Sequence, residues 1–310
     1  MTRSRGQILL IAALGIAVAV LALAVVANTA LYAETLAARD TPDGGAALAF
    51  QESMESGAGD LLDLANRHDA SKYATLVRRF EADVSALSEG AATQGALDGR
   101  VQSVRLVDVT NGSRILQNTS SEFTDADGAV DWTLAEDVAD VRRFEIVTQR
   151  SSLNHTTGPS PFTVTVSDGS DTWRAEIAAA DPNSIQLTVS NGVTTETCSV
   201  SGPTATVDLS AGRLNGTACS VPTIAETVSA PYAITVENGD AGAGRFRVYV
   251  EKTYPEIETA PYNPGAGTDP YLTRALFDAT VEVHYEGRAI EYSSNTTVAP
   301  TEPPPGAVYR

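Results

Sequence analysis

Hydrophobic and polar positions follow two different periods along this chain of 310 residues. Between residues 46 and 89, apolar side chains recur at steps of three and four, a spacing that places them on one face of an α-helix. The pattern is interrupted around residues 67–71, and Thr41-Pro42 supplies a cap and a favoured first position. It therefore predicts two amphipathic helices. Their apolar positions are Leu61, Leu64, Ala65, Tyr73, Leu76, Val77, Phe80, Val84 and Leu87.

From about residue 99 the period changes to two, which is typical of β-strands with one buried face. Several of these runs are separated by dipeptides that favour tight turns, and a run from Ala279 to Tyr292 reads as one further strand. We therefore expect an α+β protein with an antiparallel, β-rich, sandwich-like domain. The turn dipeptides are Asn111-Gly112, Asp168-Gly169, Asn191-Gly192, Ala211-Gly212 and Asn238-Gly239.

An apolar run near the amino terminus, Ile8 to Ala27, contains no charge and no proline. As a helix it would be about 30 Å long, enough to span a bilayer. Arg3 and Arg5 precede it, so the positive-inside rule places the amino end in the cytoplasm and the rest outside. A cleaved secretory signal is the alternative, but its apolar region is usually shorter, and the small-x-small site Ala22-Leu23-Ala24 lies inside this run.

These patterns divide the chain into five predicted parts, and the protein is expected in the cell membrane as a single-pass chain. They are a cytoplasmic stub (1–7), a transmembrane helix (8–32), a helical stalk (33–98), a β-rich extracellular domain (99–297) and a proline-rich disordered tail (298–310).

The junction Arg5-Gly6-Gln7-Ile8 places a basic residue, a glycine and a glutamine directly before the apolar helix. It resembles the class III signal of archaeal type IV pilin-like proteins. The resemblance implies cleavage between Gly6 and Gln7 by a prepilin-type peptidase, and packing with other pilin-like subunits in the bilayer. Many pilins carry a glutamate where this chain has Ile11, so filament assembly stays open, as does the alternative of a plain signal anchor.

The composition is acidic, with a formal charge of −18, and its basic residues include only two lysines, Lys72 and Lys252. This balance excludes an electrostatic nucleic-acid binder, which needs a basic stripe along its surface. The acidity and the scarcity of lysine resemble haloarchaeal proteins, whose self-repulsion is screened because the Debye length in molar salt is about 3 Å.

Two cysteines, Cys198 and Cys219, both lie in the part predicted to be outside the cell, where a disulfide is the natural expectation. Five N-glycosylation sequons lie on the same side and indicate an exposed glycoprotein. Their acceptor residues are Asn111, Asn118, Asn154, Asn215 and Asn295.

Signals for chemistry are weak, and we expect neither an enzyme nor a cofactor or metal. His68, His155 and His284 lie far apart, without metal-ligand spacing, and the common nucleophile and phosphate-binding motifs are absent. The aspartate-rich segment Asp125–Asp131 reads as a solvated acidic turn, with calcium binding as the alternative. The tyrosine- and proline-rich loop Tyr254–Tyr271 is expected to pack over the end of the domain, with ligand binding as the alternative.

The function expected from these features is that of a membrane-anchored structural or adhesive protein of the cell surface, such as a minor pilin-like subunit. The alternative is an anchored module that binds a solute or polymer of the envelope.

Overall fold

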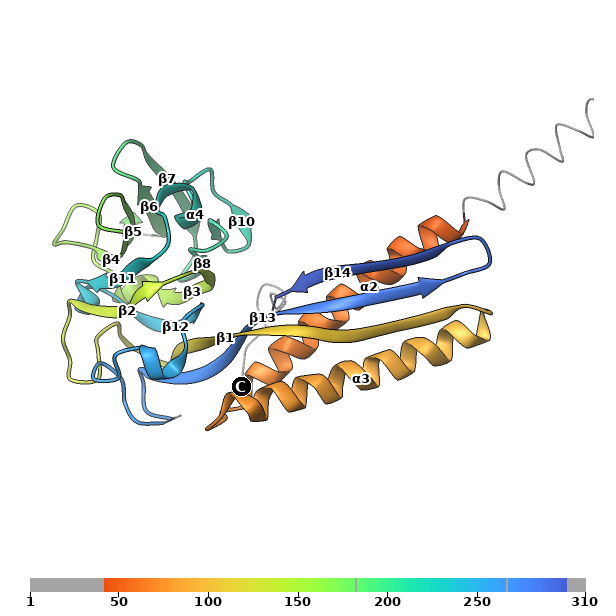
Figure 1. Cartoon of the computed structure of the whole chain (residues 1–310). Helices are drawn as coiled ribbons and strands as arrows, with labels where there is room; N and C mark the ends of the chain where they lie inside the picture. Colours follow the sequence, from red (N-terminus) through yellow and green to blue (C-terminus); the bar gives the residue numbers. More distant parts are fainter. Residues whose placement is uncertain (1–41, 182, 266, 300–310) are drawn as a thin grey trace, which may run out of the picture.

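The computed structural model describes residues 42–299 with the exception of 182 and 266 (Figure 1). The signal residues Arg5, Gly6 and Gln7, the apolar run and most of the predicted tail therefore lie outside the described residues. Within residues 42–299, no helix is long and apolar enough to cross a membrane.

Two helices begin the described chain, α2 (Pro42–Asn66) and α3 (Tyr73–Leu97). They confirm the two helices predicted from the apolar period, including the break between them. The period exists because one face of each helix is buried. The buried apolar side chains are Ala47, Phe50, Met54, Ala58, Leu62, Ala65, Leu76, Phe80, Val84 and Ala91.

Fourteen strands follow in the described residues, with four short helical turns between them. The strands are β1 (Val101–Glu122), β2 (Trp132–Val138), β3 (Val141–Gln149), β4 (Phe162–Ser167), β5 (Thr172–Asp181), β6 (Ser184–Ser190), β7 (Thr195–Ser201), β8 (Thr204–Asp208), β9 (Arg213–Leu214), β10 (Thr217–Ala218), β11 (Tyr232–Glu237), β12 (Ala243–Val250), β13 (Tyr271–Glu286) and β14 (Glu291–Val298). The turns are η1 (Arg150–Ser152), α4 (Ile224–Thr227), η2 (Gly239–Ala241) and η3 (Tyr254–Glu256).

The strands form two sheets, and within each sheet all neighbouring strands pair antiparallel. This confirms the predicted α+β class with antiparallel sheets. The larger sheet has the order β10-β9-β8-β3-β12-β1-β13-β14, and the smaller has the order β2-β11-β4-β5-β6-β7.

The described residues form two hydrophobic cores, and the strands β1 and β13 contribute to both. Figure 1 shows these two long strands running from one part of the molecule into the other. The stem consists of α2, α3, β14, residues 101–112 of β1 and residues 275–286 of β13, and its core includes Phe80, Val281 and Tyr285. The head consists of the remaining strands, whose two sheets enclose a core that includes Phe144 and Trp173. The helices α2 and α3 share the stem core with strands β1, β13 and β14. The boundary predicted between the stalk (33–98) and the β-rich domain (99–297) therefore separates residues that belong to one core.

The dipeptide Asn111-Gly112 does not form the hairpin turn predicted from it, because β1 continues through both residues. A Cβ atom on Gly112 would lie 2.5 Å from the carbonyl oxygen of Val250 and 2.9 Å from Cβ of Phe277. The glycine therefore permits a close approach of two neighbouring strands rather than a turn.

The turn at Asn238-Gly239 likewise differs from a hairpin. It joins β11 of the smaller sheet to β12 of the larger sheet, with Asn238 in the left-handed region at φ 55°. The prediction of a turn is confirmed, but the predicted pairing of the flanking strands is wrong, since the chain changes sheets here.

Three other turn dipeptides lie where the sequence predicts them. Asp168-Gly169 joins β4 to β5, Asn191-Gly192 joins β6 to β7, and Ala211-Gly212 joins β8 to β9. In contrast, the run 279–292 is not one strand: β13 ends at Glu286 and turns back at Gly287 into β14.

Candidate functional site: the junction between stem and head

The junction is the place where β1 and β13 pass from the stem core into the head core. Thr110 pairs with Asp278 and Asn111 pairs with Leu276, so Phe277 forms a bulge in β13. At this bulge the side chain of Asn66, the last residue of α2, donates from Nδ2 to the Leu276 carbonyl at 2.8 Å. It also accepts from the Leu276 backbone amide at 2.7 Å. This fully buried asparagine therefore satisfies the backbone of Leu276 and fastens α2 to the sheet.

Tyr73, the first residue of α3, forms the second connection. Its hydroxyl donates to the Gly112 carbonyl at 2.8 Å and accepts from the Tyr254 backbone amide at 2.7 Å. The Arg274 guanidinium lies 4.1 Å from the centroid of the Tyr254 ring, a cation–π distance. Burial raises the pKa of Tyr73 above its ordinary value, so the phenol stays protonated and keeps its donor.

A third connection joins the α2–α3 turn to the strand that enters the head. The buried guanidinium of Arg114, on β1, lies 3.2 Å from the carboxylate of Asp69. One residue earlier, the Ser113 hydroxyl donates to the Lys252 carbonyl at 2.7 Å. The Tyr73 and Arg114 connections join the helices of the stem to the head, and the Asn66 connection fastens α2 to β13 at the point where that strand enters the head. The three connections hold no nucleophile next to a base.

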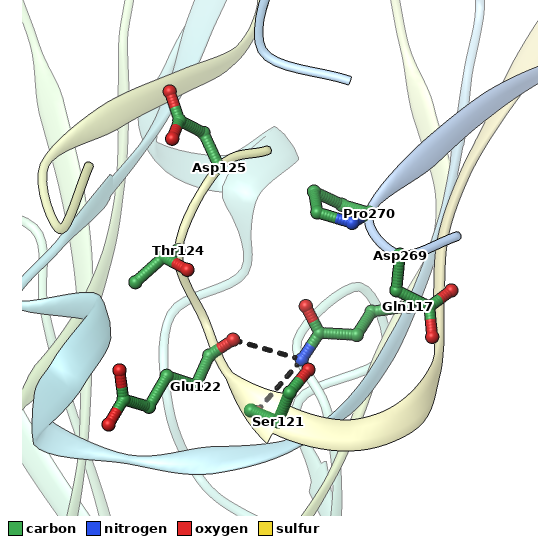
Figure 2. A pocket seen from close by; sticks show the side chains of 7 residues that line it. All are labelled: Gln117, Ser121, Glu122, Thr124, Asp125, Asp269 and Pro270. Atoms are coloured by element: carbon green, nitrogen blue, oxygen red, sulfur yellow. Dashed lines mark hydrogen bonds between the residues drawn. The ribbon is translucent and has the colours of Figure 1, made fainter. Parts of the chain in front are cut away.

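A pocket of about 450 Å³ lies in the head, at the end of β1 and the start of β13. Figure 2 shows that the carboxylates of Glu122, Asp125 and Asp269 point away from one another. The Gln117 amide nitrogen donates to the backbone carbonyls of Ser121, Glu122 and Gly244. The pocket therefore gathers no converging set of charged groups. It is lined by Gln117, Ser121, Glu122, Thr124, Asp125, Asp269 and Pro270.

The aspartate-rich turn uses its carboxylates to hold its own backbone and a neighbouring loop. Asp125 accepts from the amides of Asp127 and Ala129 at 2.9 and 2.7 Å, and Asp131 accepts from the amide of Asn238 at 2.8 Å. Across the part of the chain that the structure describes, no group of three or more His, Cys, Asp or Glu side chains could hold a metal ion.

The tyrosine- and proline-rich loop packs onto the head, as expected. Tyr262 is 7% exposed, its ring meets Trp132 edge-on at 5.8 Å, and its hydroxyl donates to the Leu134 carbonyl. Burial raises the pKa of Tyr262 well above its ordinary range. Tyr271 is buried as well, so these two tyrosines contribute to packing and present little surface to a ligand.

The predicted disulfide between Cys198 and Cys219 is present, with the two Cα atoms 6.0 Å apart. Cys198 lies on β7 and Cys219 directly follows β10, and these strands are the outer strands of the two different sheets. The bond therefore joins the two sheets of the head at one edge.

We expect loss of this disulfide to lower the free energy of unfolding by about 3 kcal/mol, since it closes a loop of about 20 residues in the unfolded chain. Urea denaturation of the double variant Cys198→Ala/Cys219→Ala in molar salt measures the loss. Reductant should destabilise the wild type by a similar amount and leave the double variant unchanged. Equal stability of wild type and double variant would contradict the expectation.

The turn between β4 and β5 makes a pH-dependent contribution to the stability of the folded protein. Asp168 accepts from the backbone amides of Ser170, Asp171 and Ser229, each at 2.8 Å. These bonds, that from Asp171 foremost, hold the pKa of Asp168 below its ordinary value. Because the pKa is lower in the folded than in the unfolded state, the stabilisation is complete above about pH 4 and is lost as the pH falls through the folded-state value.

We therefore expect Asp168→Asn to lower the melting temperature at pH 7 and to have progressively less effect as the pH falls below about 4. Melting temperatures of wild type and variant between neutral and acidic pH test this. Asp171→Asn in the same turn is the control, because its carboxylate accepts no hydrogen bond from the described residues. A difference that stays constant at all pH values would disprove the linkage.

The remaining residues singled out from the sequence lie on separate elements. His68 lies in the α2–α3 turn, His155 follows η1, and His284 lies on β13. Among the sequons, Asn111 and Asn118 lie on β1, Asn154 lies after η1, Asn215 lies in the β9–β10 turn, and Asn295 lies on β14.

Asn66, Arg114 and Arg274 have no counterpart among the predicted sites, whereas Asn111 is a predicted glycosylation site and Tyr254 begins the predicted tyrosine- and proline-rich loop. Asn66 and Tyr73 flank the predicted helix break, and a polar residue that continues the apolar face of a helix is the one local signal that points to Asn66. Arg114 and Arg274 carry no such signal.

Comparison with protein families finds a match between residues 2–124 and the family of unknown function DUF7261. The matched segment contains the apolar run, both helices of the stem and the whole of β1, which makes up less than half of the chain. No curated protein and no solved structure matches the chain. The chain is thus similar to this family over the residues that lead into the junction.

Proposed function

We propose that this chain is a single-pass membrane protein of the cell surface, with its amino end in the cytoplasm and a stem that holds the head away from the bilayer. The observation that carries the proposal is the direction of α2. Its amino-terminal end lies at the end of the stem opposite the head (Figure 1). A bilayer helix formed by Ile8–Ala27 would therefore enter the stem at the end far from the head.

The dimensions of the stem fit this role. Its helices α2 and α3 have 25 residues each, which corresponds to about 37 Å per helix. Both helices run along the sheet formed by β1, β13 and β14, and the Tyr73 and Arg114 connections of the junction join them to the head. A stem of this construction separates the head from its attachment point by a fixed distance.

The chemistry of the head supports a location outside the cytoplasm, because disulfides persist in oxidising compartments. The described residues bring together no catalytic constellation, and the most specific polar contacts serve the connection of stem and head. The role that fits these features is structural or adhesive, such as a minor pilin-like subunit. Its partners would then be the lipid bilayer, a prepilin-type peptidase and other pilin-like subunits.

The mass of the amino-terminal peptide of the membrane-extracted protein tests the signal. A chain that begins at Gln7 supports the pilin-like processing, and one that begins at Met1 or Thr2 supports an uncleaved anchor. A chain that begins after Ala27 contradicts the anchored protein. The variant Gly6→Val should block cleavage at Gln7, whereas Gly15→Val in the middle of the apolar run should not.

The two lysines offer a direct test of topology. Lys72 is exposed in the α2–α3 turn, whereas the Lys252 ammonium donates to the Glu136 carbonyl and its side chain is 12% exposed. A membrane-impermeant amine reagent applied to intact cells should therefore modify Lys72, and Lys72→Arg should abolish most of the labelling. Labelling only after cell lysis would place the stem in the cytoplasm and refute the proposal.

A further inference from the structure

The five sequons differ in whether the folded protein leaves room for a glycan. The sugar attaches to Nδ2 of asparagine, so the surroundings of that atom decide the matter. The five asparagines fall into three environments. In the first, the side chain is exposed and its Nδ2 donates to no described residue. In the second, Nδ2 already donates a hydrogen bond within the protein, and in the third, the side chain lies on the side of the sheet that faces the stem core.

Asn295 has the first environment. It lies in the middle of β14, the outer strand of the larger sheet, and is exposed. Its partner across the strands is Glu282, whereas the neighbouring Val281 and Val283 are buried in the stem core. Opposite residues of an antiparallel pair share a face of the sheet, so Asn295 lies on the face that points away from the helices.

Asn215 has the same kind of environment. It is exposed in the tight turn between β9 and β10, in the left-handed region at φ 50°. Its Oδ1 accepts from the Thr206 amide at 2.7 Å, which fixes the side chain. Nδ2 of Asn215 donates to no other described residue and remains accessible to a sugar donor.

Asn111 has the opposite environment. It pairs with Leu276, a fully buried residue of the stem core, so its side chain lies on the face that the helices cover. Its Oδ1 is buried. A glycan on Asn111 would have to displace packing on the face of the sheet that the helices cover, whether the sugar was attached before or after folding.

The other two sequons are intermediate. Nδ2 of Asn118 donates to the Tyr271 hydroxyl at 2.9 Å, and Nδ2 of Asn154 donates to the Ser160 carbonyl at 3.1 Å. Attachment of a sugar would remove one amide hydrogen from each of these nitrogens, so we expect lower occupancy there.

We infer that Asn295 and Asn215 carry N-linked glycans in the folded protein and that Asn111 does not. The inference rests on the proposed location outside the cytoplasm and deepens it. The transfer forms a bond between the anomeric carbon of a glycosyl phosphate donor and Nδ2, and breaks the anomeric carbon–oxygen bond of the donor. The amide proton that Nδ2 loses ends on the phosphate leaving group.

The glycan at Asn295 has a specific consequence for the stem. β14 is an outer strand of eight residues, and its sequence EYSSNTTV contains neither lysine nor proline, the residues that commonly protect such strands from pairing with another chain. A bulky glycan in the middle of β14 hinders the approach of a second strand. The only charge on β14 is Glu291 at its start, so the modification protects the middle of the strand and keeps copies of this chain from associating through their stems.

Mass spectrometry of proteolytic peptides from the full-length, membrane-extracted protein tests the assignment. We expect a glycan mass on the peptides that contain Asn295 and Asn215, and the unmodified mass for the peptide with Asn111. An unmodified Asn295, an unmodified Asn215 or a glycan on Asn111 would each overturn the assignment.

Variants at the third sequon position separate loss of the glycan from loss of the side chain. Thr297→Ala removes the sequon and Thr297→Ser preserves it, so only the alanine variant should lose the glycan mass at Asn295. By sedimentation velocity, we expect Thr297→Ala and Asn295→Gln to self-associate at least tenfold more tightly than Thr297→Ser. Unchanged association would refute the protective role.

Labelling of Lys72 in the same cells distinguishes the two levels of the proposal. If Lys72 is labelled from outside and Asn295 is unmodified, the glycan assignment is wrong and the proposed location stands. If Lys72 is protected in intact cells, both the location and the assignment that rests on it are wrong.

Discussion

Replacement of Gly112 by valine is expected to lower the free energy of unfolding by about 3 kcal/mol or more, because the added atoms meet backbone. The first of them would lie 2.5 Å from the Val250 carbonyl oxygen and 2.9 Å from Cβ of Phe277. Neither contact can be relieved by rotating a side chain, so β12 or β13 must move away from β1. The same strands carry the connections of the junction, so the variant should also loosen the head on the stem.

Urea denaturation in molar salt measures the loss, and Gly90→Ala is the matched control. Gly90 lies within α3, and a Cβ atom there meets nothing within 4 Å. Alanine at this position should stabilise the protein by about 0.5–1 kcal/mol through helix propensity. A Gly112→Val variant as stable as the wild type would show that the strands do not approach as closely as described.

The second large effect concerns Asn66. In Asn66→Ala, the amide and the carbonyl of Leu276 lose their partner while they remain buried, and each such group costs about 1–3 kcal/mol. We therefore expect a loss of about 4 kcal/mol in the free energy of unfolding. Asn66→Asp should be similarly destabilising, since it removes the donor and places a charge in a fully buried position.

Asn183→Ala provides the control for this prediction. Asn183 is exposed in the turn before β6, and its side chain makes no hydrogen bond to the described residues. Its replacement should change stability by less than about 0.5 kcal/mol. If Asn66→Ala unfolds at the same urea concentration as Asn183→Ala, the asparagine does not carry the connection between α2 and the sheet.

The elements predicted correctly from the sequence are those that local patterns determine. The helices follow from the apolar period because one face of each is buried, and Asp168-Gly169 forms a turn because the conformation depends on those residues themselves. Asn111-Gly112 shows the limit of such reasoning. A glycine is required at position 112 because Val250 and Phe277, which are far along the chain, approach its backbone closely. The same dipeptide in another setting would form a hairpin.

The candidate site could be predicted only in part, for the same reason. The disulfide follows from two cysteines in an oxidising compartment, and its position between the edges of two sheets does not. The junction depends on contacts between residues that are 210 positions apart for Asn66 and Leu276, and 181 apart for Tyr73 and Tyr254. A single sequence carries no local signal for pairs at that distance, so Tyr73 reads only as an apolar position of a helix and the partners of both residues stay unidentified.

The stem core is built from two segments that lie on either side of the head in the sequence, and this has a consequence for biosynthesis. During synthesis α2, α3 and the first half of β1 emerge before the head, but the strands that complete their core, residues 275–298, are made only after the head. The head, residues 113–274, can therefore collapse while the apolar faces of the helices are still uncovered. Such delayed closure exposes the nascent helices to aggregation and to chaperones until translation of β13 and β14 is complete.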